Sequence, residues 1–189
     1  MARAGRRRGA RRDAGLGGRA RGRAAPPPPG ARRRGVTTWA PTVAWCALVV
    51  VFAVLANAWN SHDPGWYAGL ERPSFQPPDV VFGVMWPLSF LLLLVVGLTS
   101  VRTAPAEVAW PATGILAVSV ALALGWAWLF YVPHRLGPAA ACLAGAAALT
   151  WVLLVVVARH EAWAGLLLVP YAVWLSVATA LSVAYARLG

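Results

Sequence analysis

The chain reads GWYAGLERPSFQPP at residues 65–78, a stretch that lies between two long apolar segments. Its prolines interrupt any continuous helix, and its aromatic residues are typical of a membrane–water interface. Phe82 and Trp86 follow at the start of the next apolar segment. The order predicts a structured loop at a membrane surface that leads into an apolar helix. Such a loop could lie over the mouth of a helix bundle as a lid, or its rings could belong to an interfacial aromatic belt.

The chain on both sides of this loop is strongly apolar. Apolar residues make up 59% of the sequence, above the roughly 45–50% of soluble proteins. Five apolar segments each have about the length with which a helix crosses the hydrocarbon core. Their runs do not alternate, and backbone groups in lipid must be satisfied within the segment, which excludes a barrel. The predicted fold class is an all-α membrane protein, a bundle of five transmembrane helices at residues 39–58, 80–101, 106–131, 138–158 and 163–186.

The connections between these segments differ in length. The first is long, whereas the other three have only a few residues each. Short connections predict that the helices they join are antiparallel neighbours.

The charge is concentrated at the N-terminus. Residues 1–35 hold twelve Arg and one Asp, whereas residues 36–189 hold five Arg and five acidic residues. We expect a disordered basic tail at 1–35 and one transmembrane domain at 36–189. The positive-inside rule places the N-terminus in the cytoplasm, and a composition without Lys and with a single Ile indicates a GC-rich bacterial genome, hence a plasma membrane. A cleaved signal ending near residues 56–58 is the alternative.

Ionisable residues are almost absent from the predicted spans. After residue 35, every His, Asp, Glu and Arg lies in or beside a predicted connection. Ion-coupled transporters carry such residues inside the membrane, and hydrolases or acyltransferases need a nucleophile within reach of a base. The pattern therefore disfavours both classes, and we expect no enzyme and no catalytic residue. Cys46 and Cys142 lack the spacing of a metal site or redox pair, so we expect no metal and no cofactor.

Two spans carry aromatic residues at helical spacing, which places them on one face of each helix. These residues are Phe82, Trp86 and Phe90 in the second span and Tyr171 and Trp174, followed by Ala178, in the fifth. Helix packing in lipid usually relies on small residues, so such faces predict either a filled core or a slot for a planar hydrophobic ligand. Trp126 and Trp128 are two residues apart, so only one of them can point inward.

Three blocks of the chain resemble the TspO/MBR family of tryptophan-rich sensory proteins and translocator proteins. Residues 65–86 resemble the family pattern W-Y-x-x-L-x-(K/R)-P-x-W-x-P-P-x-x-x-F-x-x-x-W. Residues 122–128 (LALGWAW) are similar to its third helix, and residues 167–181 (LLVPYAVWLSVATAL) to its last helix. The likeness covers residues 39–188.

The resemblance implies a five-helix bundle, often dimeric, whose first loop closes a porphyrin pocket. It implies a tetrapyrrole-binding membrane sensor or carrier, with a porphyrin or related planar hydrophobic ligand, membrane lipid and a second copy of the chain as partners, and no nucleic acid. The matched pocket residues are Phe75, Phe82, Trp86, Phe90, Trp128, Tyr171, Trp174 and Ala178.

Four positions depart from the family pattern. Phe75 replaces the loop Trp, Gly125 and Ser182 replace Asn in the third and last helices, and Ala186 replaces a late Trp. The loss of two amides predicts weaker hydrogen bonding to a propionate or carbonyl, while stacking on planar rings is retained.

Two other functions remain open. Some family members have been proposed to degrade porphyrin in light with Trp as the redox-active side chain. A third class is an interaction protein without a small ligand, whose arginine tail binds anionic lipid or nucleic acid.

Overall fold

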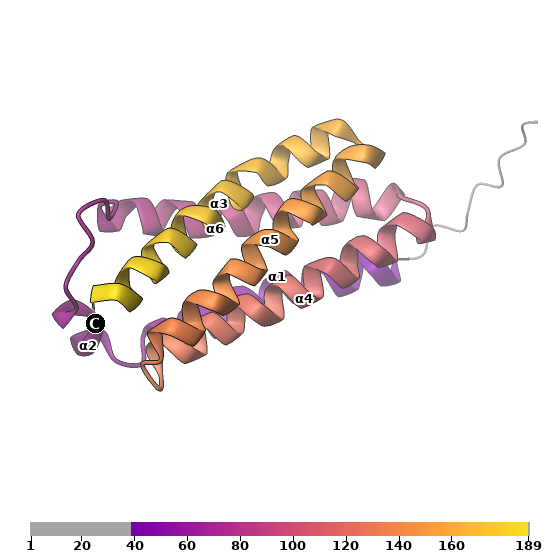
Figure 1. Ribbon diagram of the computed structural model, residues 1–189. Coiled ribbons are helices and arrows are strands. Elements are labelled where there is room, and N and C mark those ends of the chain that lie inside the picture. The colour runs from indigo at the N-terminus through magenta and orange to yellow at the C-terminus, as the bar shows by residue number, and fades with distance from the viewer. Residues whose placement is uncertain (1–38, 189) are drawn as a thin grey trace, which may run out of the picture. The chain divides into compact units, whose positions relative to one another are not determined.

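The computed structural model describes residues 39–188 (Figure 1), and the predicted tail at 1–35 lies outside them. Five of the described helices are long and apolar enough to cross a membrane, as expected. The all-α fold with five transmembrane helices is therefore confirmed. The elements are α1 (Ala40–Asn60), α2 (Pro64–Gly69), α3 (Asp79–Val96), the wider helical turn η1 (Gly97–Val101), α4 (Ala106–Tyr131), α5 (Leu136–His160) and α6 (Ala162–Leu188).

Prolines and one carboxylate set where several helices begin. Pro78 and Pro105 directly precede α3 and α4, and Pro64 is the first residue of α2. Proline is tolerated there because the first helical N–H groups have no partner within the helix. Asp63 caps α2 by accepting a hydrogen bond from the backbone N–H of Trp66 at 3.0 Å, which satisfies one of those groups. The long loop is therefore a folded element.

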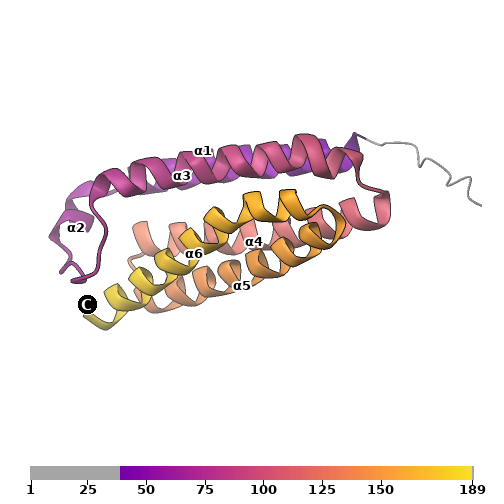
Figure 2. The same cartoon turned by 90° about the horizontal axis from the view of Figure 1, so that it is seen from above.

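The five long helices pack as a closed ring. α1 contacts α3 and α4, α5 lies between α4 and α6, and α6 contacts α3. Seen from above, α1 and α3 form one layer and α4, α5 and α6 the other (Figure 2). The short connections make α4 and α5, and α5 and α6, neighbours as predicted.

The same reasoning is wrong for α3 and α4. The short connection at residues 102–105 fixes only the distance between the two helix ends. Within the α3–η1 helix it is mainly the backbone of η1 that comes close to α4, whereas α3 meets α4 through the rings of Trp86 and Trp126. Along the bundle, α1 takes the position beside α4, and α3 packs on α1 and α6 instead.

A buried tryptophan marks the change from α3 to η1. Trp45 is fully buried, and its indole Nε1 donates to the carbonyl oxygen of Leu93 at 2.8 Å. Gly97 lies directly against this ring, where a larger residue would meet it. A side chain that engages the helical hydrogen-bond ladder distorts it, and the wide turn begins at this point. One indole thus fixes both the α1–α3 contact and the local shape of the helix.

Hydroxyl groups join α4 to α5 inside the apolar core. Ser119 Oγ donates to the carbonyl oxygen of Ala146 at 3.0 Å and lies 3.0 Å from Thr150 Oγ1, which bonds to the same carbonyl at 2.9 Å. All of these side chains are buried. Hydrogen bonds of this kind between helices stabilise membrane bundles, so α4, α5 and α6 form a firmly packed layer beside which α1 and α3 lie.

Candidate functional site

A cavity of about 540 Å³ lies between α1 and α3 at the end of the bundle that carries α2. Its volume falls within the range of about 300–1,000 Å³ for small-molecule sites. The α1 wall consists mainly of small and amide side chains: Ala53, Ala56, Asn57 and Asn60. The α3 wall consists of Asp79, Phe82, Gly83, Trp86, Pro87 and Phe90. The remaining lining residues come from α2 and α4 and are Tyr67, Trp126 and Tyr131.

Three of the lining rings are close to parallel. The Trp86 ring is stacked on Trp126, with ring centroids 6.1 Å apart and an interplanar angle of 20°. It is also stacked on Phe90, at 6.0 Å and 28°. The indole Nε1 of Trp126 donates to Ser182 Oγ at 3.2 Å, which holds that ring in place. The cavity therefore has a wall of similarly oriented aromatic faces.

Further rings support this wall from behind. Phe52, which is fully buried, meets Trp86 and Phe90 edge-on, at 5.9 and 5.2 Å between centroids. Trp174 meets Phe82 and Trp86 edge-on, at 5.2 and 6.2 Å. Edge-to-face contacts are favoured by the charge distribution of aromatic rings. The orientation of the wall is thus set by packing and does not depend on a ligand.

Polar groups lie at the α2 end of the cavity. Asn57 and Asn60 supply amides, Tyr67 and Tyr131 supply hydroxyls, and Asp79 supplies a carboxylate. Burial raises the pKa of Tyr67, and the neighbouring Tyr185 raises it further. Tyr67 is therefore a neutral phenol at physiological pH and can donate a hydrogen bond.

The loop that carries α2 covers this end of the bundle. Trp66 stacks on His134 with ring centroids 3.8 Å apart and an interplanar angle of 14°. His134 has a positive φ of 56°, an uncommon conformation in the connection between α4 and α5. Tyr67 packs on Phe130, and the hydroxyl of Tyr185 donates to Gln76. These contacts support the lid and not the belt for Trp66 and Tyr67.

A smaller cavity of about 50 Å³ lies beside the first and shares five lining residues with it. Its other walls come mostly from α6 and include Ala178, Leu181, Ser182 and Tyr185. It extends the cavity toward α6 beneath the lid.

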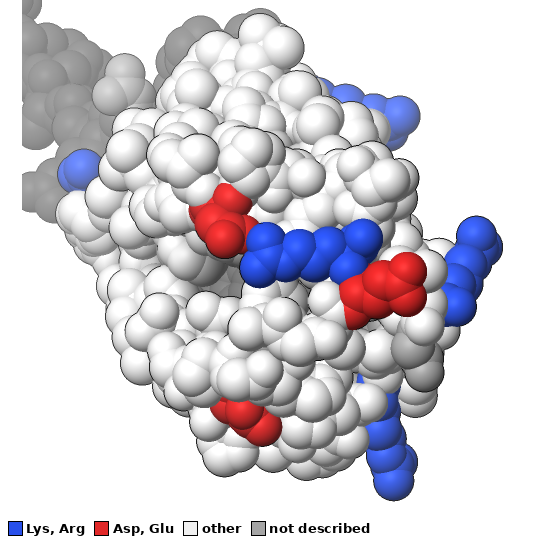
Figure 3. Space-filling model, turned by 90° about the vertical axis from the view of Figure 1, so that its left-hand side faces the viewer, with Lys and Arg blue, Asp and Glu red and all other residues white. Residues whose placement is uncertain are grey.

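The surface at the α2 end carries few charged side chains (Figure 3). Arg72 approaches Asp79 there, with 3.9 Å between guanidinium nitrogen and carboxylate oxygen, but the two side chains are 53% and 75% exposed. Exposed pairs of this kind contribute little to stability. Arg72 is therefore a solvent-exposed cation beside a residue that lines the cavity.

The residues predicted for the site fall into three groups. Phe82, Trp86 and Phe90 line the main cavity, and Ala178 lines its extension. Trp174 and Tyr171 are buried, the first directly behind the aromatic wall and the second in the main core.

Phe75 and Trp128 are 55% and 46% exposed and line neither cavity. The α4 indole that does line both is Trp126. Trp126 shares its helix face with the buried residues Ala123 and Phe130, three and four positions away. Apolar residues stand at helical spacing from Trp128 as well, so the sequence alone carries no signal that selects Trp126 over it.

The polar lining residues were also missed. Asn57 and Asn60 lie in the last turn of α1, outside the three blocks that carry the family resemblance. Tyr67 and Tyr131 belong to connections or helix ends, where an interfacial role is the ordinary interpretation. These four groups meet at one cavity only because α1 packs against α3 and α4 and the lid lies over their ends.

Comparison with known proteins agrees with this architecture. Residues 39–188 match the sequence model of the TspO/MBR family. The chain is similar to the "Tryptophan-rich sensory protein" of Cereibacter sphaeroides, with 30% identity over 127 residues, which is 65% of this chain and 76% of the relative. It is similar to "Protein CrtK" of Rhodobacter capsulatus, with 30% identity over 128 residues, 67% of this chain and 80% of the relative. It is also similar to "Tryptophan-rich protein TspO" of Archaeoglobus fulgidus, with 32% identity over 123 residues, 63% and 76% of the two chains.

The match extends over the lid and all five long helices, and each of these helices has the length and composition of a membrane span. The chain is therefore a multi-pass membrane protein that belongs to the TspO/MBR family.

Proposed function

We propose that this protein binds a tetrapyrrole such as protoporphyrin in the cavity between α1 and α3, and that it acts as a sensor or carrier of that molecule. The observation that carries the proposal is the wall of nearly parallel rings formed by Trp86, Trp126 and Phe90. A flat, largely apolar ligand can stack along such a wall, and each aromatic pair contributes about 1 kcal/mol beyond the area it buries.

The polar end of the cavity suits the carboxylates of such a ligand. Asn57 and Asn60 line the cavity from α1, and amide and phenol groups donate hydrogen bonds to carboxylate oxygens. These two amides supply side-chain N–H donors, which Gly125 and Ser182 lack. Arg72 adds a cation beside the mouth, where its partner Asp79 is exposed.

A titration of the purified protein with protoporphyrin tests the proposal. Binding should quench tryptophan fluorescence saturably and shift the Soret band. The Trp126→Ala variant, which keeps ten of the eleven Trp residues, should bind about fivefold more weakly, since a ring contact of about 1 kcal/mol is lost. Trp128→Ala is the matched control, because that ring is 46% exposed and lines neither cavity. Equal affinities for the two variants would contradict this site.

Illumination separates binding from degradation. A binder leaves the Soret band intact when the complex is illuminated in air. Bleaching faster than free dye, and slowed in Trp86→Ala or Trp126→Ala, would instead assign the aromatic wall a photochemical role.

The orientation that we propose places the N-terminus in the cytoplasm of a bacterium and the lid outside the plasma membrane. The basis is the concentration of Arg at residues 1–35 together with the positive-inside rule. A reporter enzyme that is active only outside the cytoplasm should be active when it is fused after Leu188. Activity of a cytoplasmic reporter at the same position would reverse the orientation.

A further inference from the structure

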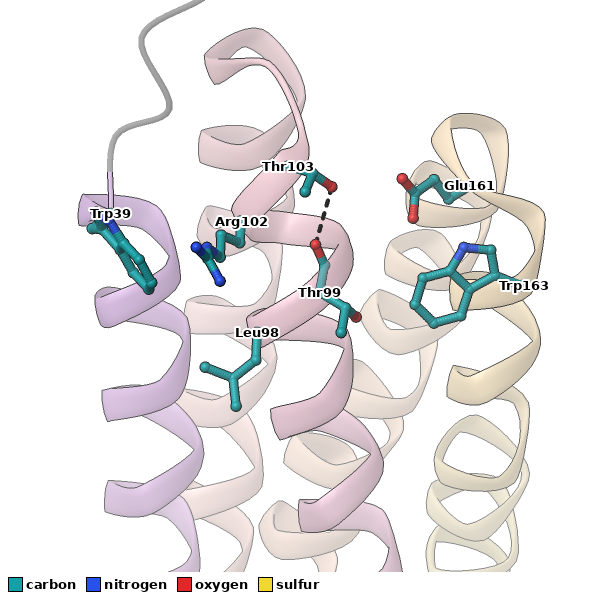
Figure 4. Close-up of a pocket in the computed structure, with 7 residues that line it drawn as sticks. All are labelled: Trp39, Leu98, Thr99, Arg102, Thr103, Glu161 and Trp163. Atoms are coloured by element: carbon teal, nitrogen blue, oxygen red, sulfur yellow. Dashed lines mark hydrogen bonds between the residues drawn. The ribbon is translucent and has the colours of Figure 1, made fainter.

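A second cavity, of about 760 Å³, lies at the end of the bundle opposite to the lid. It lies between the start of α1, the end of the α3–η1 helix and the start of α6 (Figure 4). Its polar or aromatic lining residues are Trp39, Thr99, Arg102, Thr103, Glu161 and Trp163. None of them lines the cavity beneath the lid.

The cavity lies at the level where the membrane meets water. The spans end at Val101 and begin at Ala40 and Ala162, so its charged residues lie just beyond the apolar segments. Trp39 and Trp163 flank it and are 55% and 46% exposed. Exposed Trp residues at such positions lie among lipid headgroups.

One side of the cavity carries a cation. The guanidinium carbon of Arg102 lies 4.1 Å from the centroid of the Trp39 ring, and this cation–π contact holds the charge near α1. Among residues 39–188, Arg102 forms no ion pair. A guanidinium has five N–H donors, so an anionic group such as a phosphate has a partner here.

Apart from the indole N–H of Trp163, the side chains on the other side supply hydrogen-bond acceptors. In Figure 4, Glu161 lies across the cavity from Arg102, with Thr103 and Thr99 between them. Thr99 Oγ1 donates its proton to the carbonyl oxygen of Val95 at 2.5 Å, and Thr103 Oγ1 donates to that of Thr99 at 3.0 Å. The carboxylate of Glu161 forms no ion pair among the described residues. This carboxylate and the free lone pairs of the two threonine oxygens can only accept hydrogen bonds. This side suits an ammonium group with N–H donors.

We infer that this cavity binds the headgroup of a phosphoethanolamine lipid, the phosphate at Arg102 and the ammonium at Glu161 and the two threonine oxygens. A zwitterionic headgroup carries a charge of the opposite sign for each of the two sides. Leu98, which also lines the cavity and is 51% exposed, gives the site an apolar side along which an acyl chain can pass into the bilayer.

The inference predicts an order of headgroups. Phosphatidylcholine has a cation without N–H donors, so it cannot donate to Glu161 or the threonines. Phosphatidylglycerol offers only neutral hydroxyl donors to Glu161, and its net negative charge is repelled by that carboxylate. Of the three lipids, phosphatidylethanolamine alone brings both a phosphate and an ammonium group with N–H donors to the cavity.

Native mass spectrometry of the full chain in detergent tests this order, with the three lipids supplied with identical acyl chains. The wild-type protein should retain phosphatidylethanolamine in preference to the other two. Glu161→Gln should reduce that preference over phosphatidylglycerol by roughly two- to fivefold, the range of a part-exposed ion pair. Arg102→Gln should weaken the binding of all three lipids by a similar factor, because all three contain the phosphate.

Two controls separate the site from general electrostatics. Glu71→Gln removes an exposed carboxylate at the lid end and should leave the preference unchanged, and all variants retain the basic tail. Inorganic phosphate should not displace the lipid, since the free ion fills only one side. The inference is overturned if wild-type protein shows no preference for phosphatidylethanolamine, if Glu161→Gln keeps it, if Glu71→Gln removes it, or if phosphate displaces the lipid.

Discussion

Replacement of Gly97 by Ala should destabilise the bundle far more than a single methyl group normally does. A Cβ atom at Gly97 would come into direct conflict with Cδ1 of the Trp45 ring, and it would lie 2.9 Å from its Nε1 and 3.1 Å from its Cγ. Trp45 is fully buried and donates to Leu93. The ring has no free space into which it can move without breaking that hydrogen bond.

The expected loss combines two effects. Overpacking of a well-packed core destabilises by about 1–3 kcal/mol, and a buried donor that loses its acceptor adds about 1–3 kcal/mol. Because the ring can relieve the overlap partly by giving up the bond, the two do not add in full, and we expect a total of about 2–4 kcal/mol.

Unfolding in detergent can be followed with a thiol-reactive dye, because the chain has only two cysteines and both are partly shielded. Cys46 is adjacent to Trp45, so it reports on the region that is changed. Gly97→Ala should release the thiols at a clearly lower temperature than wild type.

Gly114→Ala provides the matched control. A Cβ at Gly114, also within a transmembrane helix, has nothing within 4 Å. There the substitution should stabilise slightly, by roughly 0.5–1 kcal/mol, because Gly is a poor helix former. Removing the indole with Trp45→Leu should abolish most of the penalty of Gly97→Ala in the double variant. The reasoning is refuted if Gly97→Ala is as stable as Gly114→Ala, or if its penalty persists without the indole.

Three further predictions concern other parts of the molecule. Gly165→Ala should destabilise the bundle by at least as much as Gly97→Ala, since the new Cβ would lie 2.8 Å from the backbone Cα of Ala158, which cannot rotate away. The measurement is the loss of monodisperse protein on a sizing column, and unchanged elution would contradict the α5–α6 contact. Asn57→Ala with Asn60→Ala should weaken the binding of protoporphyrin several-fold and the binding of its dimethyl ester less, because a neutral ester carbonyl accepts a weaker hydrogen bond than a carboxylate, as a titration with both ligands would show; equal losses would mean that the amides do not bind the carboxylates. Because burial raises the pKa of Tyr67, the contribution of Tyr67 to folding stability should be constant below the ordinary tyrosine pKa of about 10 and fall above it, as the unfolded chain loses the proton first; a Tyr67→Phe variant should lose less stability above that pH in thermal unfolding, and an identical decline would exclude Tyr67 as a cause.

The five spans could be predicted from the sequence because the requirement of a helix in lipid depends only on local composition and length. Which helices pack against each other could be predicted less well than the spans themselves. A short connection limits how far apart two helix ends lie, but the packing of whole faces decides which helices touch, and α3 packs on α1 and α6 despite its short link to α4. The bond from Trp45 to Leu93 spans 48 positions in the sequence, and no local pattern indicates it.

The candidate site was predicted in part for similar reasons. Spacing of four placed Phe82, Trp86 and Phe90 on one face, and these three do line the cavity. Choosing between Trp126 and Trp128 required knowing which face of α4 is covered, and that depends on the neighbouring helices. The amides of Asn57 and Asn60 become relevant only once α3 lies beside α1.

The wide turn at Gly97–Val101 also determines in which direction around the helix axis the side chains after it point. Successive residues of an α-helix are about 100° apart around its axis, and a π-type turn accommodates an additional residue, so the segment after it is rotated by about that angle. Arg102 comes directly after the turn and faces Trp39, while Trp86 and Phe90 before it face the other cavity. Deleting one residue from the turn would therefore rotate Arg102 away from Trp39 and α1. The aromatic wall, which precedes the turn, would keep its position.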